Sequence, residues 1–275
     1  MKSAFAARYG AYAVVAGASE GLGEAFAHAI AARGVGLVLL ARRAEVLERV
    51  AAAVRARHGV DVRALPVDLA RPDFAEALRE ATRGVEVGLG IYNAAYSTID
   101  PFVDRPLEDA LRVIEVNCAG PLRLAHALAP AMIERRRGGL VLMASIAGFQ
   151  GVPRIAAYAA SKAFNTVFAE GLWYELRGHG VDVLAACPGA IRTPAYLKTT
   201  DREVAGTMDA SEVASNVLDA IGRGPTFVPG AVNKLARFFL GRMLSRRNAV
   251  HVMGASTAHL RDASRLPGRS AGEAP

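Results

Sequence analysis

The sequence predicts an α/β protein built on a doubly wound parallel sheet in a single domain. Short runs rich in apolar residues alternate with longer runs of helical periodicity, which is the order of repeated βαβ units. Residues 35–41 are almost unbroken in apolar character, as expected for a strand covered by helices on both faces. A glycine-rich stretch lies directly after the first predicted strand, where a tight turn leads into a helix.

The predicted elements follow one another without an internal repeat or an interior linker. We expect strands at 12–16, 35–41, 61–67, 87–92, 139–144, 181–186 and 226–228. We expect helices at 24–33, 44–58, 72–83, 107–136, 157–177, 211–221 and 233–247, the fourth of them broken near Gly120-Pro121. Residues 1–261 are therefore expected to form one domain. Residues 262–275, rich in Ser, Gly, Pro, Ala and Arg, are expected to be a disordered tail.

The basic charge raises the hypothesis of an anionic partner. The formal net charge is +7 and the sequence pI is about 9.8. The arginine runs at 42–43, 135–137 and 246–247 are dispersed, and no aromatic platform or recognition helix accompanies them. We expect these runs to be solvated helix ends, and no nucleic-acid partner.

Cysteine usage and hydropathy indicate the compartment. Cys118 and Cys187 lie far apart in apolar surroundings, so we expect neither a disulfide nor a metal site, and a reducing environment. Residues 1–11 do not resemble a secretion signal, and no uncharged apolar stretch is long enough to span a membrane. The sequence predicts a cytoplasmic protein without a membrane span.

The predicted helix at 233–247 combines basic residues with an apolar face. That face consists of Leu235, Phe238, Phe239 and Leu244. A role at a membrane surface is one interpretation of this pattern. Packing into the core or a subunit contact is the more common one.

The glycine-rich stretch has the form of a phosphate-binding loop. Gly17, Gly21 and Gly23 permit positive φ angles and a close approach of backbone amides to a phosphate. The intervening Ser19, Glu20 and Leu22 are expected to contact the same ligand. The helix that follows presents its free N–H groups and positive dipole end to a pyrophosphate, as in the Rossmann-type dinucleotide fold.

The residues after the second strand indicate which dinucleotide is bound. Arg42 and Arg43 stand where an acidic residue would bind the 2′-hydroxyl of NAD, which favours NADP, with NAD as the alternative. The alternative is that one or both arginines simply begin the next helix and are exposed to solvent. Asp68, followed by Leu69, ends the third strand, and either binds the adenine amine or caps the following helix.

The strongest local signal for chemistry is Tyr158-x-x-x-Lys162. A spacing of four places both side chains on one face of a helix. A cation beside the phenol stabilises the phenolate, so we expect a lowered pKa and an acid–base role for Tyr158. Ser145 follows the fifth strand, and Asn117 lies in the long helix before it.

These residues, in this order, resemble the short-chain dehydrogenase/reductase family from about residue 12 to residue 194. The motifs that carry the resemblance are Gly17-x-x-x-Gly21-x-Gly23, Asn93-Ala94, Asn117, Ser145, Tyr158-x-x-x-Lys162 and Pro188-Gly189-x-x-x-Thr193-Pro194. The resemblance implies hydride transfer between NAD(P) and the carbonyl or alcohol carbon of a small molecule. It also implies a homodimer or homotetramer assembled through residues 111–135 and 158–176.

The resemblance assigns a role to each motif residue. Tyr158 would exchange the proton with the substrate oxygen, and Ser145 would hydrogen-bond that oxygen. Lys162 would lower the pKa of Tyr158 and bind the nicotinamide ribose, while Asn117 would position a water that links Lys162 to solvent. Thr193 would bind the carboxamide, and Asn93, Ala94, Pro188, Gly189 and Ile191 would line the rest of the cofactor site. Two departures from the family pattern, Ala16 and Ala95, put the cofactor affinity in doubt and leave the reaction class intact.

The substrate side is the least informative part of the sequence. The family's pocket segments supply Tyr96, Phe149, Ile155 and Tyr196, which predicts a largely apolar substrate, although each residue is individually typical of core or lid packing. Residues 195–207 lack a strong pattern and are expected to form a lid. Two alternatives remain: an epimerase or dehydratase on the same fold, and a cofactor-binding regulatory or scaffold protein without turnover.

Overall fold

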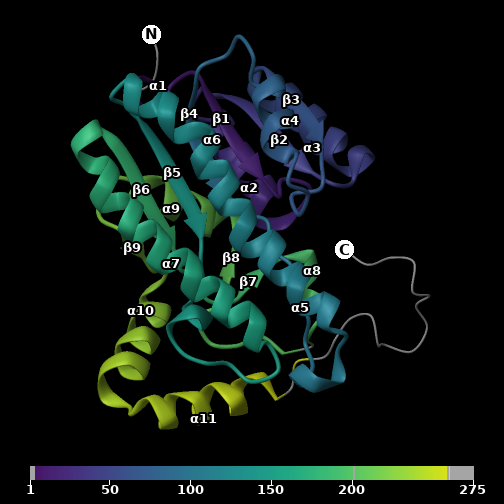
Figure 1. Ribbon diagram of the computed structural model, residues 1–275, viewed down its shortest axis with the longest axis vertical. Coiled ribbons are helices and arrows are strands. Elements are labelled where there is room, and N and C mark those ends of the chain that lie inside the picture. The colour runs from purple at the N-terminus through teal and green to yellow at the C-terminus, as the bar shows by residue number, and fades with distance from the viewer. Residues whose placement is uncertain (1–3, 201, 259, 261–275) are drawn as a thin grey trace.

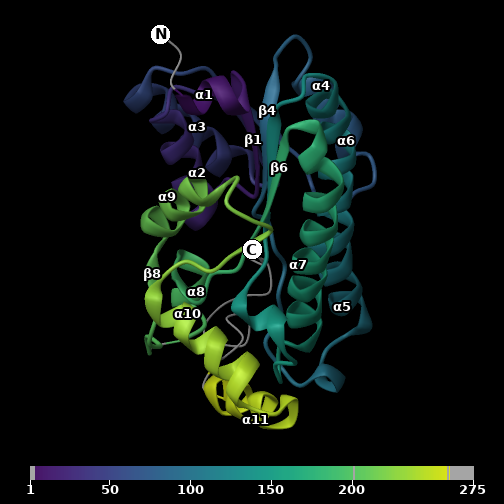
Figure 2. The same ribbon diagram turned by 90° about the vertical axis from the view of Figure 1, so that its left-hand side faces the viewer.

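The computed structural model describes residues 4–200, 202–258 and 260, and its centre is a seven-stranded parallel sheet. The strand order is β3-β2-β1-β4-β5-β6-β9, and helices cover both faces (Figures 1 and 2). The strands are β1 (Tyr12–Ala16), β2 (Gly36–Ala41), β3 (Val62–Pro66), β4 (Val87–Tyr92), β5 (Gly138–Met143), β6 (Val181–Ala186) and β9 (Thr226–Phe227). A second, two-stranded sheet pairs β7 (Ile191–Arg192) with β8 (Met208–Asp209).

The helices form two layers, one on each face of the sheet. One layer comprises α2 (Gly21–Ala31), α3 (Ala44–His58) and α9 (Ala210–Ala220), and the other comprises α4 (Phe74–Ala81), α6 (Gly120–Glu134) and α7 (Ala156–Leu176) (Figure 2). The remaining α-helices are α1 (Ala4–Tyr9), α5 (Leu107–Ile114), α8 (Pro194–Leu197), α10 (Ala231–Phe238) and α11 (Arg246–Thr257). Short turns are η1 (Phe102–Asp104), η2 (Glu115–Ala119), η3 (Ile146–Phe149), η4 (Arg177–His179) and η5 (Phe239–Met243).

Alternate residues of each strand point into different cores. In β1, Ala13 and Val15 pack with the α2–α3–α9 layer, whereas Val14 and Ala16 pack with the α4–α6–α7 layer. Every residue of β2 is buried, because helices cover both of its faces. The doubly wound parallel sheet predicted from the sequence is confirmed, and the first six predicted strands match β1–β6 to within one residue at each end.

The long helix predicted at 107–136 is continuous from α5 through η2 to α6. Its irregular turn lies at residues 115–119, a few residues before the break expected near Gly120-Pro121. The irregularity is the π-helical turn η2, which ends just before Gly120 and Pro121 begin α6. Tyr92 explains the glycine, since its ring and hydroxyl occupy the place that a Cβ at position 120 would need. The Tyr92 hydroxyl donates a hydrogen bond to the Val116 carbonyl of this turn at 2.6 Å.

The prediction of one helix over 233–247 is wrong. The chain forms α10 and the π-turn η5 and then becomes extended at Leu244. The Ser245 hydroxyl accepts a hydrogen bond from the backbone N–H of Asn248 and so starts a separate helix, α11. The helices α1 and α11 were not predicted. The expected tail at 262–275 lies outside the described residues.

Helix α1 packs against the half of the sheet that contains β4, β5 and β6. Arg8 forms an ion pair with Asp182 of β6, with 2.9 Å between Nη2 and Oδ2. The Tyr9 hydroxyl donates to the same carboxylate at 3.0 Å. Asp182 raises the pKa of Tyr9, as does burial of the phenol, so the hydroxyl remains a donor.

Three features bear on the compartment and on metals. Cys118 and Cys187 are free and buried. Within residues 4–200, 202–258 and 260, no helix is long and apolar enough to cross a bilayer. The same residues contain no cluster of three His, Cys, Asp or Glu side chains suited to a metal ion.

Candidate active site

The predicted site residues gather at the carboxyl edge of the sheet. The chain reverses its direction of winding at β1, which pairs with β2 on one side and β4 on the other. Ligands of open α/β sheets bind at such a switch point. The segments that leave β1, β4, β5 and β6 carry the glycine loop, Asn93-Ala94, Ser145 and Pro188-Gly189.

The glycine loop is shaped so closely around its neighbours that side chains do not fit. Gly17 has φ +84°, and a Cβ on it would lie 2.6 Å from Cα of Ala94. A Cβ on Gly23 would overlap the Gly17 carbonyl oxygen. Glu20 stands at the N-cap of α2 without a side-chain cap hydrogen bond, so the first N–H groups of α2 are not capped by it. This cradle fits the pyrophosphate of a dinucleotide.

Asn93 and Ala94 brace the loop from the neighbouring strand. Both backbone N–H groups donate to the Ala16 carbonyl at 2.9 Å. The Asn93 amide also donates to the Gly17 carbonyl at 2.9 Å. The motif after β4 therefore fixes the conformation of the loop after β1.

Arg43 reaches from the start of α3 back to the glycine loop. Its Nη2 lies 2.9 Å from Oε2 of Glu20 and 3.4 Å from Oγ of Ser19. Arg42 is exposed beside it. Arg43 is thus placed both at the N-cap of α3 and against the glycine loop, and the contact of Arg42 and Arg43 with a 2′-phosphate stays a prediction.

Asp68 does not cap the helix that follows β3, so that alternative is wrong. Its Oδ1 accepts a hydrogen bond from the N–H of Ala70 at 3.0 Å and closes a turn, while α4 starts later, with Asp73 at its N-cap. Its Oδ2 lies 3.4 Å from Nη2 of Arg112. Leu69 is buried in the core. The adenine contact stays a prediction.

Tyr158 and Lys162 lie one turn apart on α7, as the spacing predicts. Nζ of Lys162 is 5.4 Å from the centre of the Tyr158 ring. The ammonium is buried and donates a hydrogen bond to the Met143 carbonyl at the end of β5, at 2.7 Å. The Ser145 side chain favours the ionised form of the Tyr158 phenol and so acts to lower the pKa of Tyr158. The serine hydroxyl accepts from the N–H of Ala147 at 3.2 Å, which fixes its position at the start of η3.

Asn117 sits in the π-turn η2 and is linked through its neighbours to the helix that carries Tyr158 and Lys162. We call Asn117, Ser145, Tyr158 and Lys162 the tetrad. The Asn117 amide donates to Oγ of Ser161 at 3.0 Å and to the Tyr96 carbonyl at 2.9 Å, and its Oδ1 accepts from the Tyr96 N–H at 2.7 Å. It therefore clamps the loop after β4 to α7, beside Lys162.

The electrostatics of the pair differ from the expectation. Burial raises the pKa of Tyr158 to about 12, although the hydrogen bond with Ser145 acts to lower it. Burial also lowers the pKa of Lys162 from 10.5 to about 8. Desolvation disfavours both charged forms, so it outweighs the stabilisation of a phenolate by the neighbouring ammonium. The expected depression of the Tyr158 pKa is not found in this structure.

The segment after β6 brings Thr193 to the same site, while Ile191 packs against the core on the α2–α3–α9 side and its cofactor contact stays a prediction. A Cβ on Gly21 would lie 3.0 Å from Cγ2 of Thr193, so the threonine borders the glycine loop. Thr193 also starts α8 by accepting a hydrogen bond from the Tyr196 N–H at 3.2 Å. Upstream, the Pro188 carbonyl accepts from Ile146 N–H at 3.0 Å, which ties this segment to the one that carries Ser145.

Further residues of that segment form contacts of their own. Asn233 occupies the space that a Cβ on Gly189 would need. In the predicted lid at 195–207, Glu203 forms an ion pair with Arg192 of β7 at 2.5 Å.

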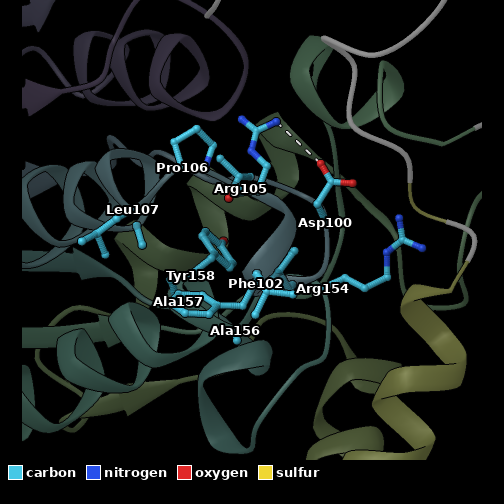
Figure 3. A pocket seen from close by; sticks show the side chains of 13 residues that line it. Asp100, Phe102, Arg105, Pro106, Leu107, Arg154, Ala156, Ala157 and Tyr158 are labelled. Carbon is cyan, nitrogen blue, oxygen red and sulfur yellow. Dashed lines mark ion pairs between the residues drawn. The ribbon is translucent and has the colours of Figure 1, made fainter.

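A cavity of about 260 Å³ opens beside Tyr158 (Figure 3). Its apolar walls include Phe102, Leu107 and Ile155, and its charged members are Asp100, Arg105 and Arg154. Figure 3 shows the Tyr158 ring among the apolar side chains, the ion pair of Arg105 with Asp100, and Arg154 pointing away from Tyr158. The cavity suits a substrate whose reacting carbon is held in apolar surroundings.

Of the four predicted substrate residues, Ile155 lines this cavity and the other three make contacts elsewhere. Tyr96 donates to Asp109 at 2.9 Å, Phe149 stacks under the guanidinium of Arg237 at 4.4 Å, and Tyr196 donates to the Arg202 carbonyl at 3.5 Å. Phe102, Leu107 and Arg154 line the cavity and were not predicted to do so. The apolar residues that follow the fourth strand were the available signal for the first two. Arg154, with φ +68°, had none.

Comparison with known proteins agrees with this geometry. The family model for short chain dehydrogenases matches residues 11–203. A 7beta-hydroxysteroid dehydrogenase of Clostridium sardiniense is 32% identical over 233 residues, which cover 84% of this chain and 89% of that protein. A solved 7beta-hydroxysteroid dehydrogenase superposes with a TM-score of 0.85 at 27% identity, covering 90% of this chain and 98% of that one. A short-chain dehydrogenase of Sphingobium yanoikuyae in complex with NADPH gives 0.74 at 29% identity, covering 95% and 98%.

Proposed function

The chain belongs to the short-chain dehydrogenase/reductase family and is an NAD(P)-dependent oxidoreductase, and on that premise we propose its cofactor, its acid–base residue and its class of substrate. The cofactor we propose is NADP(H), the substrate a largely apolar ketone or alcohol, and the proton-transfer residue Tyr158. The observation that carries the proposal is that Tyr158 lines an apolar cavity while the buried ammonium of Lys162 lies 5.4 Å from the centre of its ring.

Each residue of the tetrad has a task in this proposal. NADP(H) supplies or accepts the hydride when it is bound. Tyr158 donates its proton to the substrate oxygen during reduction and takes it back during oxidation. Ser145 hydrogen-bonds the same oxygen and stabilises its developing charge. Lys162, held by Met143, places a positive charge beside the phenol and the ribose, and Asn117 positions α7 against the loop after β4.

Turnover assays test the reaction and the substrate class. We expect NADPH oxidation with bulky apolar ketones, oxosteroids included, and little with charged sugars, because the cavity beside Tyr158 has apolar walls. A 7beta-hydroxysteroid dehydrogenase is among the relatives, which makes hydroxysteroids and their ketones the first compounds to assay. Tight NADPH binding without turnover of any carbonyl or alcohol would instead favour a regulatory, non-catalytic protein.

The NADP preference rests on Arg42 and Arg43 and has its own test. Replacing both with alanine removes the guanidinium groups that would pair with a 2′-phosphate. The dissociation constant for NADPH should rise about 10- to 100-fold, which corresponds to the free energy of losing hydrogen bonds to a charged group. The dissociation constant for NADH should change little. Arg49→Ala, the same change on an exposed residue of α3, is the control. Equal weakening of both nucleotides would show that these arginines do not recognise the phosphate.

We also propose a homodimer or homotetramer located in the cytoplasm. Exposed apolar side chains on α5, α6 and α7, namely Leu111, Leu122 and Val167, support self-association through these helices. The free, buried cysteines support a reducing compartment.

A further inference from the structure

The end of the described chain forms a helical arm, residues 231–257, composed of α10, η5 and α11. The arm lies at the end of the molecule toward which the strands point, at the bottom of Figures 1 and 2. Its second helix packs beside the substrate cavity. Met253 contacts the small cluster that includes Tyr158, and the Thr257 hydroxyl donates to the Pro153 carbonyl at 3.3 Å.

The first helix of the arm exposes both cations and apolar side chains. Its two cations contact rings of the protein body, with Arg237 4.4 Å from the ring centre of Phe149 and Lys234 5.7 Å from that of Phe227, and both stay exposed. Its apolar side chains recur at the spacing of one helix face and are between 49% and 63% exposed. They are Val232, Leu235, Phe238, Phe239 and Met243. We call these five residues the apolar stripe. A surface helix of a protein that stays in water buries such a stripe.

The charge of the arm is of one sign. No Asp or Glu occurs between Asp219 and Asp262. Beside the apolar stripe, Arg242, Arg246 and Arg247 are all exposed at the outer turn of the arm. The arm thus exposes Phe, Leu and Met side chains next to arginines, and no carboxylate lies among them. Helices that lie in the interface of an anionic membrane have this composition.

We propose that the arm docks this enzyme on an anionic lipid surface, with the apolar stripe inserted among the lipids and the three arginines on their headgroups. A second copy of the chain fits the stripe less well, because a two-fold interface would bring both sets of arginines together without a carboxylate on the arm. A duplex nucleic acid would leave the apolar stripe in water. If the substrate is apolar, as proposed above, docking also brings the rim of its cavity to the lipid phase.

Co-sedimentation of the full-length protein with lipid vesicles tests the proposal without an activity assay. We expect binding to phosphatidylcholine vesicles that contain phosphatidylserine, weaker binding at high salt, and little binding to phosphatidylcholine alone. Arg246→Glu with Arg247→Glu should weaken binding more than about 25-fold, since each cation near such a surface contributes about fivefold. Leu235→Ser with Phe239→Ser should abolish it.

Matched variants separate this surface from a general effect of charge or apolarity. Arg49→Glu with Arg79→Glu makes the same charge change on α3 and α4, and Val103→Ser with Leu197→Ser removes exposed apolar side chains from η1 and α8, outside the helices proposed for self-association. Both controls should bind vesicles as the wild type does, and thermal unfolding verifies that every variant is folded. Failure of the wild type to bind anionic vesicles overturns the proposal whether or not the enzyme turns over ketones. Dissociation of an oligomer by Leu235→Ser with Phe239→Ser, with vesicle binding unchanged, overturns it as well and assigns the stripe to a second copy.

Discussion

Replacing Tyr158 with phenylalanine should lower kcat/KM by about 10²- to 10⁴-fold, which is the usual contribution of a general acid–base residue. The substitution removes the hydroxyl that would exchange a proton with the substrate oxygen and keeps the ring that lines the cavity. NADPH affinity should change little, because the glycine loop that holds the pyrophosphate is untouched. Steady-state kinetics together with a fluorescence titration of the nucleotide measure the two effects separately.

The same helix offers a control for Tyr158→Phe. Tyr174 is exposed near the end of α7, and Tyr174→Phe should leave kcat/KM unchanged. If Tyr158→Phe keeps more than a tenth of wild-type activity, another group transfers the proton.

Because burial raises the pKa of Tyr158 to about 12, the hydroxyl is protonated at neutral pH. Ketone reduction should therefore be favoured near pH 7, and alcohol oxidation should accelerate as the pH rises.

Replacing Lys162 with methionine should lower kcat/KM by about 10²- to 10⁴-fold, comparable to the loss of the acid itself. Methionine fills the buried space without the charge that assists the phenol. The Met143 carbonyl also loses its donor at 2.7 Å, so the end of β5 is held less firmly. Wild-type-like turnover in this variant would show that the ammonium is dispensable.

Lys162 also makes the folding stability depend on pH. Its pKa is about 8 in the folded chain against 10.5 for an ordinary lysine, so the unfolded state binds more protons between these values. Stability from this group therefore rises as the pH increases from 8 to 10.5, by at most about 3 kcal/mol. Below pH 8 the buried charge destabilises the fold by that amount.

Denaturant unfolding at pH 7 and pH 10 checks this prediction. The free energy of unfolding of the wild type should increase relative to that of Lys162→Met between the two values. Lys198→Met, the same change at an exposed lysine, should follow the wild type. A constant difference between the wild type and Lys162→Met would mean that Lys162 does not titrate in this range.

The parts of the fold and site that the sequence predicted are those with a local cause. The strands were predictable because buried parallel strands are continuously apolar, as residues 36–41 are. The pairing of Tyr158 with Lys162 followed from helix geometry alone. The glycine loop was predictable because Gly17 and Gly23 each occupy a place where no Cβ fits.

The parts that escaped prediction depend on tertiary packing. The pKa of Tyr158 was expected to fall, and burial raised it, because the depth of the site is not a property of the motif. The cavity walls come from the loop after β4 folded against the start of α7, so Arg154 could not be placed in them by its neighbours in sequence. Ser245 was a usable signal for a new helix, but the helical periodicity on both sides of it concealed the break.

The ion pair between Arg8 and Asp182 has a consequence for the order in which the protein is assembled during synthesis. The two residues are 174 positions apart, so α1 waits for this partner until β6 has been synthesised. Strands β1, β2 and β3 can pair well before that, because each is joined to the next by one short helix. Arg8 and Tyr9 reach their contacts with Asp182 only when β6 takes its place in the sheet, whereas α1 can already pack on β4 and β5.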